Sequence, residues 1–251
     1  MKVFFIGAGP GDYELLTIKA KKIISRSDIV IYAGSLINKD ILKFTKKHAI
    51  TYDSSNMTLE EILKVIENAK STDKIIARLH SGDPSIYSAI QEQIEWCQKQ
   101  NIDYEVVPGV SSFCAASASL KQELTLPGIS QTVIISRISG RTKVPPKEDL
   151  KRLSKIKATL IIFLSVDRIK EVVDKLLYGY PKSTPVACVY RASWPDEKII
   201  RGTLEDIADK LKKEGIRKQA IVFVGEVLRK KGFKKSKLYN KTFSHSYRRA
   251  R

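Results

Sequence analysis

The sequence predicts an α/β fold built from two α/β domains. Short runs of branched apolar residues alternate along the chain with segments whose apolar residues recur at the period of a helix. Polar, glycine-bearing turns follow several of these runs, as at residues 7–12 and 81–84. The chain has 251 residues, which is enough for one large domain or two modest ones.

The first half of the chain combines four expected strands with three expected helices. The strands are expected at residues 3–6, 28–32, 74–79 and 104–107. The helices are expected at residues 14–25, after Thr58, and at residues 85–97. Thr58 and Glu61 have the spacing of a capping box, which marks the start of the second helix.

The alternation then restarts in the second half. Strands are expected at residues 132–136, 159–164, 186–190, 199–201 and 220–224, with helices beginning near Asp167 and after Thr203. A segment of small residues at 115–120 leads to a Pro-Gly turn, which favours a boundary shortly before it. We therefore predict an N-terminal domain at residues 1–113, a C-terminal domain at 114–228 and a basic tail at 229–251.

The charge of the chain is strongly positive, at +18. Ten lysines and arginines and no acidic residue lie in the tail, so residues 1–228 keep a net charge of +8. A basic surface can bind nucleic acid through its phosphates, and a basic cleft can instead attract a polyanionic small substrate. A charge run of this kind is also commonly a solvated segment.

Several classes of protein are not favoured by the sequence. No apolar run approaches the roughly 20 residues of a membrane span, and the N-terminus lacks the pattern of a signal peptide. Cys97, Cys114 and Cys188 are odd in number and far apart, which indicates reduced thiols in the cytoplasm. The three histidines form no ligand motif, so no metal site is expected.

Two glycine-bearing turns are candidate ligand loops. The turn at 7–12 fails as a dinucleotide motif, because its third glycine would fall at Asp12 and Pro10 has no amide proton. It is either a structural turn or a loop whose backbone approaches a ligand. At the second turn, Asp83 and Pro84 would fit the start of a helix, while Asp83 or the backbone near Gly82 could bind a ribose or an amino group.

Three further segments have both a structural and a functional interpretation. Ser111 and Ser112 follow a Pro-Gly turn and could either cap a helix or bind a ligand. Trp194 is expected to be a packing residue rather than a platform for stacking, and Arg191 near it is suited to binding a carboxylate. The loop at 137–143 holds three cations, including Arg137 and Arg141, and is either an exposed loop or a grip for substrate carboxylates.

Taken together, these segments resemble the tetrapyrrole methylase family over residues 2–228. The motifs that carry the resemblance are Gly-Ala-Gly-Pro-Gly-Asp at 7–12, Tyr-Ala-Gly-Ser-Leu-Ile at 32–37, Gly-Asp-Pro-Ser-Ile-Tyr at 82–87, Pro-Gly-Val-Ser-Ser at 108–112, Leu-Pro-Gly at 126–128, Tyr-Arg-Ala-Ser-Trp-Pro-Asp at 190–196 and Gly-Thr-Leu at 202–204. The second and sixth motifs point to the branch that methylates carbon 11 of precorrin-4 or of its cobalt complex, in cobalamin synthesis.

The resemblance implies two α/β domains, S-adenosylmethionine in the crevice between them, and a homodimer. The positions that match the cofactor-binding motifs of the family are Pro10, Ser81, Gly82, Asp83, Ile86, Ser111, Ser112, Leu164 and Ala192. The implied substrate is an anionic tetrapyrrole, and we hypothesise that Arg137, Arg141 and Arg191 contact its carboxylates. The resemblance identifies no catalytic residue, since a sulfonium donor needs mainly to be aligned with an electron-rich carbon.

Two other functions compete with this expectation. One is methylation of a ribose in ribosomal RNA, which the +18 charge also fits. The other is a noncatalytic nucleic-acid-binding protein that uses the basic tail, where four aromatic residues could stack on bases: Phe233, Tyr239, Phe243 and Tyr247. The motifs at 32–37 and 190–196 argue for the tetrapyrrole and against nucleic acid as the partner.

Overall fold

The structure is a computed structural model, and it describes residues 1–229 and 232–250. It divides into two compact units, each with its own sheet and helices, which confirms the predicted α/β class. The first unit comprises Met1–Ser119 together with Arg191–Glu197, and the second comprises Leu120–Tyr190 and the chain from Lys198 onward. This division differs from the predicted one, because residue 113 lies inside a helix and residues 191–197 hydrogen-bond to the first unit.

The first unit contains a five-stranded sheet in which every pairing is parallel. Its strands are β1 (Lys2–Gly7), β2 (Ile29–Tyr32), β3 (Ile50–Asp53), β4 (Ile75–His80) and β5 (Asp103–Val107). They lie in the order β3-β2-β4-β1-β5. The strand β3 was not predicted, because its first two residues are exposed and it lies at the edge of the sheet.

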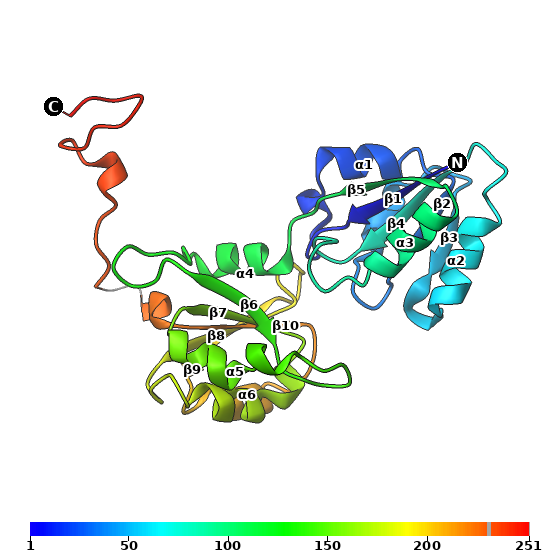
Figure 1. Cartoon of the computed structure of the whole chain (residues 1–251). Helices are drawn as coiled ribbons and strands as arrows, with labels where there is room; N and C mark the ends of the chain where they lie inside the picture. The colour runs from blue at the N-terminus through cyan, green and yellow to red at the C-terminus, as the bar shows by residue number, and fades with distance from the viewer. Residues whose placement is uncertain (230–231, 251) are drawn as a thin grey trace. The chain divides into compact units, whose positions relative to one another are not determined.

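Helices cover both faces of this sheet (Figure 1). The helix α1 (Ile18–Ile24) packs through Ala20 and Ile24 on one face, in a core with Ile6 and Leu79. The helices α2 (Leu59–Glu67) and α3 (Gln91–Lys99) pack on the other face. Burial on both faces explains why β1, β2 and β4, in the middle of the sheet, are mainly apolar.

Local hydrogen bonds decide where α1 and α2 begin. The capping box of α2 is confirmed, since Glu61 Oε2 accepts from the Thr58 amide at 2.7 Å and Thr58 Oγ1 accepts from the Glu61 amide at 3.3 Å. The helix predicted at 14–25 begins only at Ile18, because Thr17 Oγ1 accepts from the Ala20 amide and acts as its N-cap.

The helix predicted at 85–97 is wrong over its first turns, since α3 begins only at Gln91. Tyr87 and Ala89 have positive φ angles of 52° and 48°, which a right-handed helix does not accommodate. The apolar spacing at 85–90 therefore belongs to an irregular loop.

The second unit contains a mixed five-stranded sheet. Its strands are β6 (Val133–Arg137), β7 (Thr159–Phe163), β8 (Pro185–Tyr190), β9 (Lys198–Thr203) and β10 (Ala220–Val224), in the order β6-β7-β10-β8-β9. The pair β6 and β7 is parallel, and the other pairs are antiparallel. The other helices of the chain are α4 (Ser112–Leu120), α5 (Leu150–Leu153), α6 (Ile169–Leu176) and α7 (Ile207–Lys213).

One apolar core joins α6 and α7 to the mixed sheet. It includes Leu160 and Ile162 of β7 with Leu176 of α6 and Leu211 of α7. The helix predicted to follow Thr203 begins at Ile207, because Asp206 Oδ1 accepts from the Thr203 amide at 2.8 Å and closes a turn before it.

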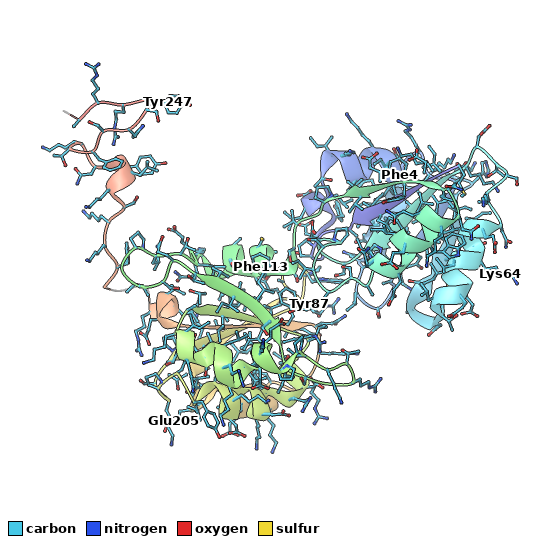
Figure 2. All side chains as sticks on the ribbon, viewed as in Figure 1. Phe4, Lys64, Tyr87, Phe113, Glu205 and Tyr247 are labelled. Carbon is cyan, nitrogen blue, oxygen red and sulfur yellow. The ribbon has the colours of Figure 1, made fainter. Side chains whose placement is uncertain are left out.

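Short 3-10 helices complete the chain at Tyr13–Leu15, Lys39–Phe44, Ser54–Asn56, Pro146–Glu148, Ser154–Ile156, Val166–Arg168, Glu226–Arg229 and Lys237–Tyr239. Within the basic tail, Arg248 donates to the carbonyls of Leu238 and Asn240, and the Tyr247 side chain is 96% exposed (Figure 2). Among residues 1–229 and 232–250, no helix has the length and apolar character needed to cross a membrane.

Candidate functional site

Three loops leave the carboxyl edge of the parallel sheet and form the candidate site. They are the β1 loop (residues 8–12), the β4 loop (81–90) and the β5 loop (108–111). The strands β4, β1 and β5 are neighbours. The chain leaves β1 for α1 on one face of the sheet and leaves β4 for α3 on the other. This is a topological switch point, where open α/β sheets bind their ligands.

Glycine backbones bring the three loops into contact. The Gly82 amide donates to the Gly9 carbonyl at 2.8 Å, and the Gly9 amide donates to the Gly82 carbonyl at 3.2 Å. A Cβ on Gly109 would lie 2.3 Å from the Gly82 carbonyl oxygen, and a Cβ on Gly7 would lie 2.5 Å from Gly109 Cα. Only glycine permits this approach, so the three loops form one backbone surface.

Asp83 ties the β4 loop to the β5 loop. Its Oδ2 accepts from the Gly109 amide at 2.9 Å, and its Oδ1 accepts from the amide and the hydroxyl of Ser85 at 2.8 and 2.5 Å. Burial by itself would raise the pKa of Asp83, but these hydrogen bonds outweigh it and hold the pKa below its usual range. Asp83 is therefore a carboxylate that closes a turn, and the expectation that it caps a helix is wrong.

Two buried basic side chains on β4 lie directly before its loop. The Arg78 guanidinium donates to Ser54 Oγ at 3.0 Å and to Gln93 Oε1 at 3.3 Å. Burial lowers the pKa of Arg78 to about 10, which leaves it charged at neutral pH. Burial, with a contribution from the Arg78 charge, lowers the pKa of His80 to about 3. His80 is thus neutral, and its buried Nε2 has no hydrogen-bond partner among residues 1–229 and 232–250.

The three loops are acidic in a basic protein. Asp12 and Asp83 are their only charged residues, and they contain no lysine, arginine or histidine. The chain as a whole has a charge of +18. The loops therefore carry negative charge and no positive side chain that would attract a phosphate.

Residues 191–197, here called the 191–197 segment, reach the same loops from far along the chain. Trp194 Nε1 donates to the Pro10 carbonyl at 2.9 Å, and Ser193 Oγ accepts from the Asp12 amide at 3.0 Å. Arg191 pairs with Asp196 at 2.6 Å and stacks on the Trp194 ring at 4.1 Å. The Arg191 side chain is thus held within its own segment.

The structure brings together most of the residues predicted to bind the cofactor. All of them except Leu164 lie in the first unit, on the three loops, at the start of α4 or in the 191–197 segment. Pro10, Gly82, Ser111 and Ala192 are buried there. Leu164 lies in the second unit, directly after β7, with a φ of 50° and a side chain that is 66% exposed.

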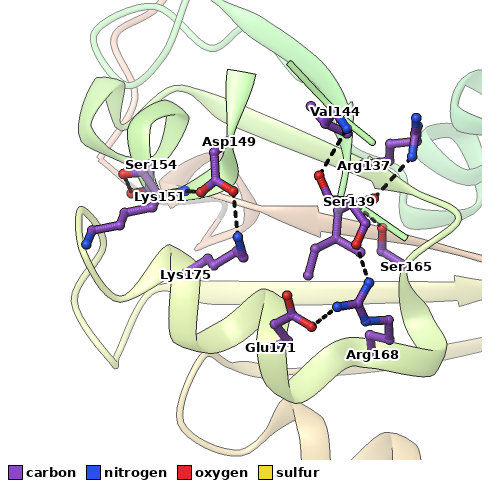
Figure 3. Close-up of polar contacts among 11 residues, drawn as sticks. Arg137, Ser139, Val144, Asp149, Lys151, Ser154, Ser165, Arg168, Glu171 and Lys175 are labelled. Atoms are coloured by element: carbon purple, nitrogen blue, oxygen red, sulfur yellow. Dashed lines mark hydrogen bonds and ion pairs between the residues drawn. The ribbon is translucent and has the colours of Figure 1, made fainter. Parts of the chain in front are cut away.

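Two of the arginines predicted to bind substrate lie around the loop that follows β6: Arg137 is the last residue of β6, and Arg141 lies in the loop itself. Arg137 donates to the carbonyls of Thr142 and Lys143 at 2.9 and 3.2 Å, so it stabilises its own loop. Figure 3 shows the further support of this loop, in which Arg168 bridges the Ser139 carbonyl and Glu171. Arg141 is exposed to solvent in this loop.

Sequence reasoning missed the partners of these residues. The sequence predicts that Gly7 and Gly109 belong to turns, but their mutual contact depends on the pairing of β1 with β5. Trp194 was expected to pack, and no local pattern links it to Pro10, which is 184 residues away. The glycines at three strand ends were the one local feature of the sequence that could have indicated these contacts.

Comparison with known proteins places these features in a family. The family model for tetrapyrrole (corrin/porphyrin) methylases matches residues 2–208. A cobalt-precorrin-4 C(11)-methyltransferase of Methanocaldococcus jannaschii is 57% identical over 99% of this chain and 96% of its own length. A protein of the same name from Priestia megaterium is 42% identical over 99% of this chain and 98% of its own length. These matches include nearly all of the basic tail, which the predicted resemblance left outside.

Solved structures agree with the sequence matches. A cobalt precorrin-4 methyltransferase of cobalamin biosynthesis superposes with a TM-score of 0.88 and 42% identity, covering 90% of this chain and 95% of that one. A uroporphyrin-III C-methyltransferase of Thermus thermophilus, solved with S-adenosylhomocysteine, has a TM-score of 0.77 and 27% identity, covering 91% and 94%. With its full-length relatives and its switch-point loops, this chain belongs to the tetrapyrrole (corrin/porphyrin) methylase family.

Proposed function

We propose that this protein transfers a methyl group from S-adenosylmethionine to carbon 11 of cobalt-precorrin-4, giving cobalt-precorrin-5 in cobalamin biosynthesis. The observation that carries the proposal is the 57% identity, over nearly the whole of both chains, to a cobalt-precorrin-4 C(11)-methyltransferase. Relatives at 43% identity are named precorrin-4 C(11)-methyltransferases, so the metal-free macrocycle is the alternative substrate.

The loops of the first unit fit S-adenosylmethionine electrostatically. The donor carries a positive sulfonium and a positive ammonium against one carboxylate, and is therefore a net cation. The three loops offer Asp12 and Asp83 and no positive side chain. A dinucleotide would bring phosphates to the same edge and be repelled. The charge of the loops thus supports this cofactor over a nucleotide.

All of the residues proposed to hold the cofactor except Leu164 belong to the first unit. Pro10 contributes from the β1 loop, and Ser111 and Ser112 from the end of the β5 loop and the start of α4. Ser81, Gly82, Asp83 and Ile86 contribute from the β4 loop. Ala192 adds a buried small side chain from the 191–197 segment. Leu164 is proposed to contribute from the end of β7 in the second unit.

The chemistry requires orientation more than a reactive side chain. When bound, S-adenosylmethionine supplies a methyl group already activated for in-line displacement. The task of the chain is to hold donor and acceptor in register, which accounts for loops locked by glycine contacts and by Asp83. Desolvation by neighbouring atoms, followed by the Asp83 charge, raises the pKa of the exposed Cys114, so this neighbouring thiol is protonated and is a poor nucleophile.

The substrate is a polycarboxylate, and the proposal assigns its carboxylates to arginines. Arg141 is exposed and free to bind an anion directly. Arg137 contributes by stabilising the loop that presents Arg141. Arg191 contributes from the 191–197 segment, where Asp196 and Trp194 orient its guanidinium.

The proposal also includes a homodimer in the cytoplasm. The family resemblance supports the dimer, and three free cysteines in the described residues suit a reducing compartment. Light scattering on the purified protein tests the oligomeric state.

The decisive experiment offers three acceptors with methyl-labelled S-adenosylmethionine: cobalt-precorrin-4, precorrin-4 and ribosomal RNA. Label in the cobalt complex at carbon 11 supports the proposal. Faster labelling of metal-free precorrin-4 would assign the alternative substrate, and label in RNA alone would overturn the assignment to tetrapyrroles.

A further inference from the structure

The 191–197 segment holds the backbone of the β1 loop in a defined place. Trp194 Nε1 donates to the Pro10 carbonyl at 2.9 Å, and Ser193 Oγ accepts from the Asp12 amide at 3.0 Å. These two bonds flank Gly11. The loop thus receives one donor and one acceptor from side chains that lie about 180 residues further along the chain.

The indole of Trp194 also fills the space beside Gly11. A Cβ on Gly11 would lie 2.1 Å from Cδ1 and 2.2 Å from Nε1 of Trp194. Any side chain at this position therefore collides with the ring. The contact needs a residue without a side chain on the loop and a rigid ring on the segment.

The segment itself is braced. Glu197 Oε2 accepts from the Ser193 amide at 2.7 Å and from the Ser119 hydroxyl of α4 at 2.8 Å. Arg191 stacks over the Trp194 ring and forms an ion pair with Asp196. The ring and the Ser193 hydroxyl are therefore oriented before any ligand binds, as a preorganised support requires.

We propose that Trp194 and Ser193 are positioning residues for the cofactor: they fix the Pro10–Asp12 backbone against which S-adenosylmethionine binds. This inference rests on the proposed function, because it assumes that the β1 loop contacts the cofactor. It assigns to the 191–197 segment a role in donor binding that is separate from any contact between Arg191 and the tetrapyrrole.

The first test is a comparison of two tryptophan variants by calorimetry with S-adenosylhomocysteine. Trp194→Phe keeps a ring but loses the hydrogen bond to Pro10, and it should raise the Kd between about 3-fold and 10-fold. The matched control is Trp96→Phe in α3, the other tryptophan of the chain, which should leave the Kd unchanged. An unchanged Kd in Trp194→Phe would overturn the proposal.

Kinetics separate positioning from a general loss of structure. In Trp194→Phe the KM for S-adenosylmethionine should rise, while kcat at saturating donor and the KM for the macrocycle stay within about twofold of the wild type. A fall in kcat and a rise in the KM for the macrocycle as large as the rise in the KM for S-adenosylmethionine would indicate a structural role only and would contradict the inference.

A double-mutant cycle tests the contact between Gly11 and Trp194 directly, independently of the Trp194→Phe variant. Gly11→Ala should weaken S-adenosylhomocysteine binding at least about tenfold in the wild-type background, because the new methyl group meets the indole. In the Trp194→Ala background the same change should have a much smaller effect. Equal effects in both backgrounds would refute the contact.

A wild-type control distinguishes failure of this inference from failure of the proposed function. If the wild-type protein binds neither S-adenosylmethionine nor S-adenosylhomocysteine, the proposed function itself is wrong. If it binds them and all Trp194 variants bind equally well, only the positioning role is wrong.

Discussion

Asp83 has the largest number of roles among the residues of the site. It closes the turn at Ser85, joins the β4 loop to Gly109 of the β5 loop and is one of only two charges on the three loops. Its hydrogen bonds hold its pKa below the usual range. A charge-assisted bond to a backbone amide is stronger than a neutral one, so loss of the charge affects both stability and binding.

Asp83→Asn should lower the free energy of unfolding by about 1–2 kcal/mol at pH 7, because the carboxylate is partly exposed and its bonds are partly screened. Because the folded pKa is lowered, the stabilisation is present above about pH 4 and is lost as the pH falls through the folded pKa. Urea denaturation of the variant and wild type from pH 7 to pH 3 should therefore show a difference that shrinks on acidification. Asp73→Asn, an exposed aspartate in the same unit, is the control and should show no such difference.

His80 also makes the protein less stable in acid, but for a different reason from Asp83: it is neutral in the folded chain and takes up a proton on unfolding. Burial lowers its pKa to about 3, while an unfolded histidine titrates near 6.5. Between these values the unfolded chain binds a proton that the folded chain does not, so stability falls as the pH falls through this window. This penalty comes in addition to that of any carboxylate.

His80→Phe should remove this pH dependence. From pH 7 to pH 5 the wild type should lose up to about 2 kcal/mol of stability relative to the variant, as measured by urea denaturation. His48→Phe changes an exposed histidine and should behave like the wild type. Parallel pH profiles for wild type and His80→Phe would show that His80 is accessible to protons in the folded state.

At the scale of elements, loops define the site and the regular elements place them. The sheet brings β4, β1 and β5 side by side, and the glycines let their loops touch. The β4 loop runs to residue 90 because positive φ angles at Tyr87 and Ala89 prevent a helix there. The loop after β6 is stabilised in another way, by Arg137 and Arg168 donating to its carbonyls.

This second loop presents Arg141 to solvent, and we expect that arginine to bind substrate. Arg141→Ala should raise the KM for the macrocycle about 3-fold to 10-fold and leave kcat and the KM for S-adenosylmethionine unchanged. The effect should decline as salt is raised, since exposed charges are screened. As a control, Lys155→Ala removes a different exposed cation of the same unit and should leave all three parameters unchanged. Unaltered kinetics in Arg141→Ala would exclude this arginine from the proposed substrate site.

At the scale of the whole molecule, charge is distributed unevenly. The tail from residue 229 accounts for ten of the 18 net positive charges, while the three loops of the first unit are acidic. Apart from the Lys234 amide, which donates to the Pro127 carbonyl, the hydrogen bonds of residues 232–250 link the tail mainly to itself. We therefore expect the tail to take no part in the proposed chemistry.

Truncation after Arg229 should leave kcat/KM for the tetrapyrrole within about twofold of the full chain and should reduce any salt-sensitive binding to RNA. Steady-state methylation and a filter-binding assay with ribosomal RNA measure the two effects. Loss of methylation on truncation would assign the tail a part in catalysis and contradict this division of roles.

Much of this organisation followed from local sequence. Alternating apolar runs and helical periods predict the α/β class, the capping box predicts α2, and glycine-bearing strand ends predict the loops of the site. These signals succeed because each depends on neighbours within a few residues, through backbone hydrogen bonds and side-chain periodicity. They failed at residues 85–90, where Asp83 bonds to Ser85 and Gly109 instead of capping a helix.

The tertiary structure determined the features of the site that depend on long-range contacts. Strand order creates the switch point between β1 and β4, and β1 pairing brings Gly7 against Gly109. The 191–197 segment joins the first unit through Trp194 and Ser193, although the chain places it between β8 and β9. By itself the sequence determined which residue types could form a site; their partners depended on contacts between residues up to 184 positions apart, which no local pattern encodes.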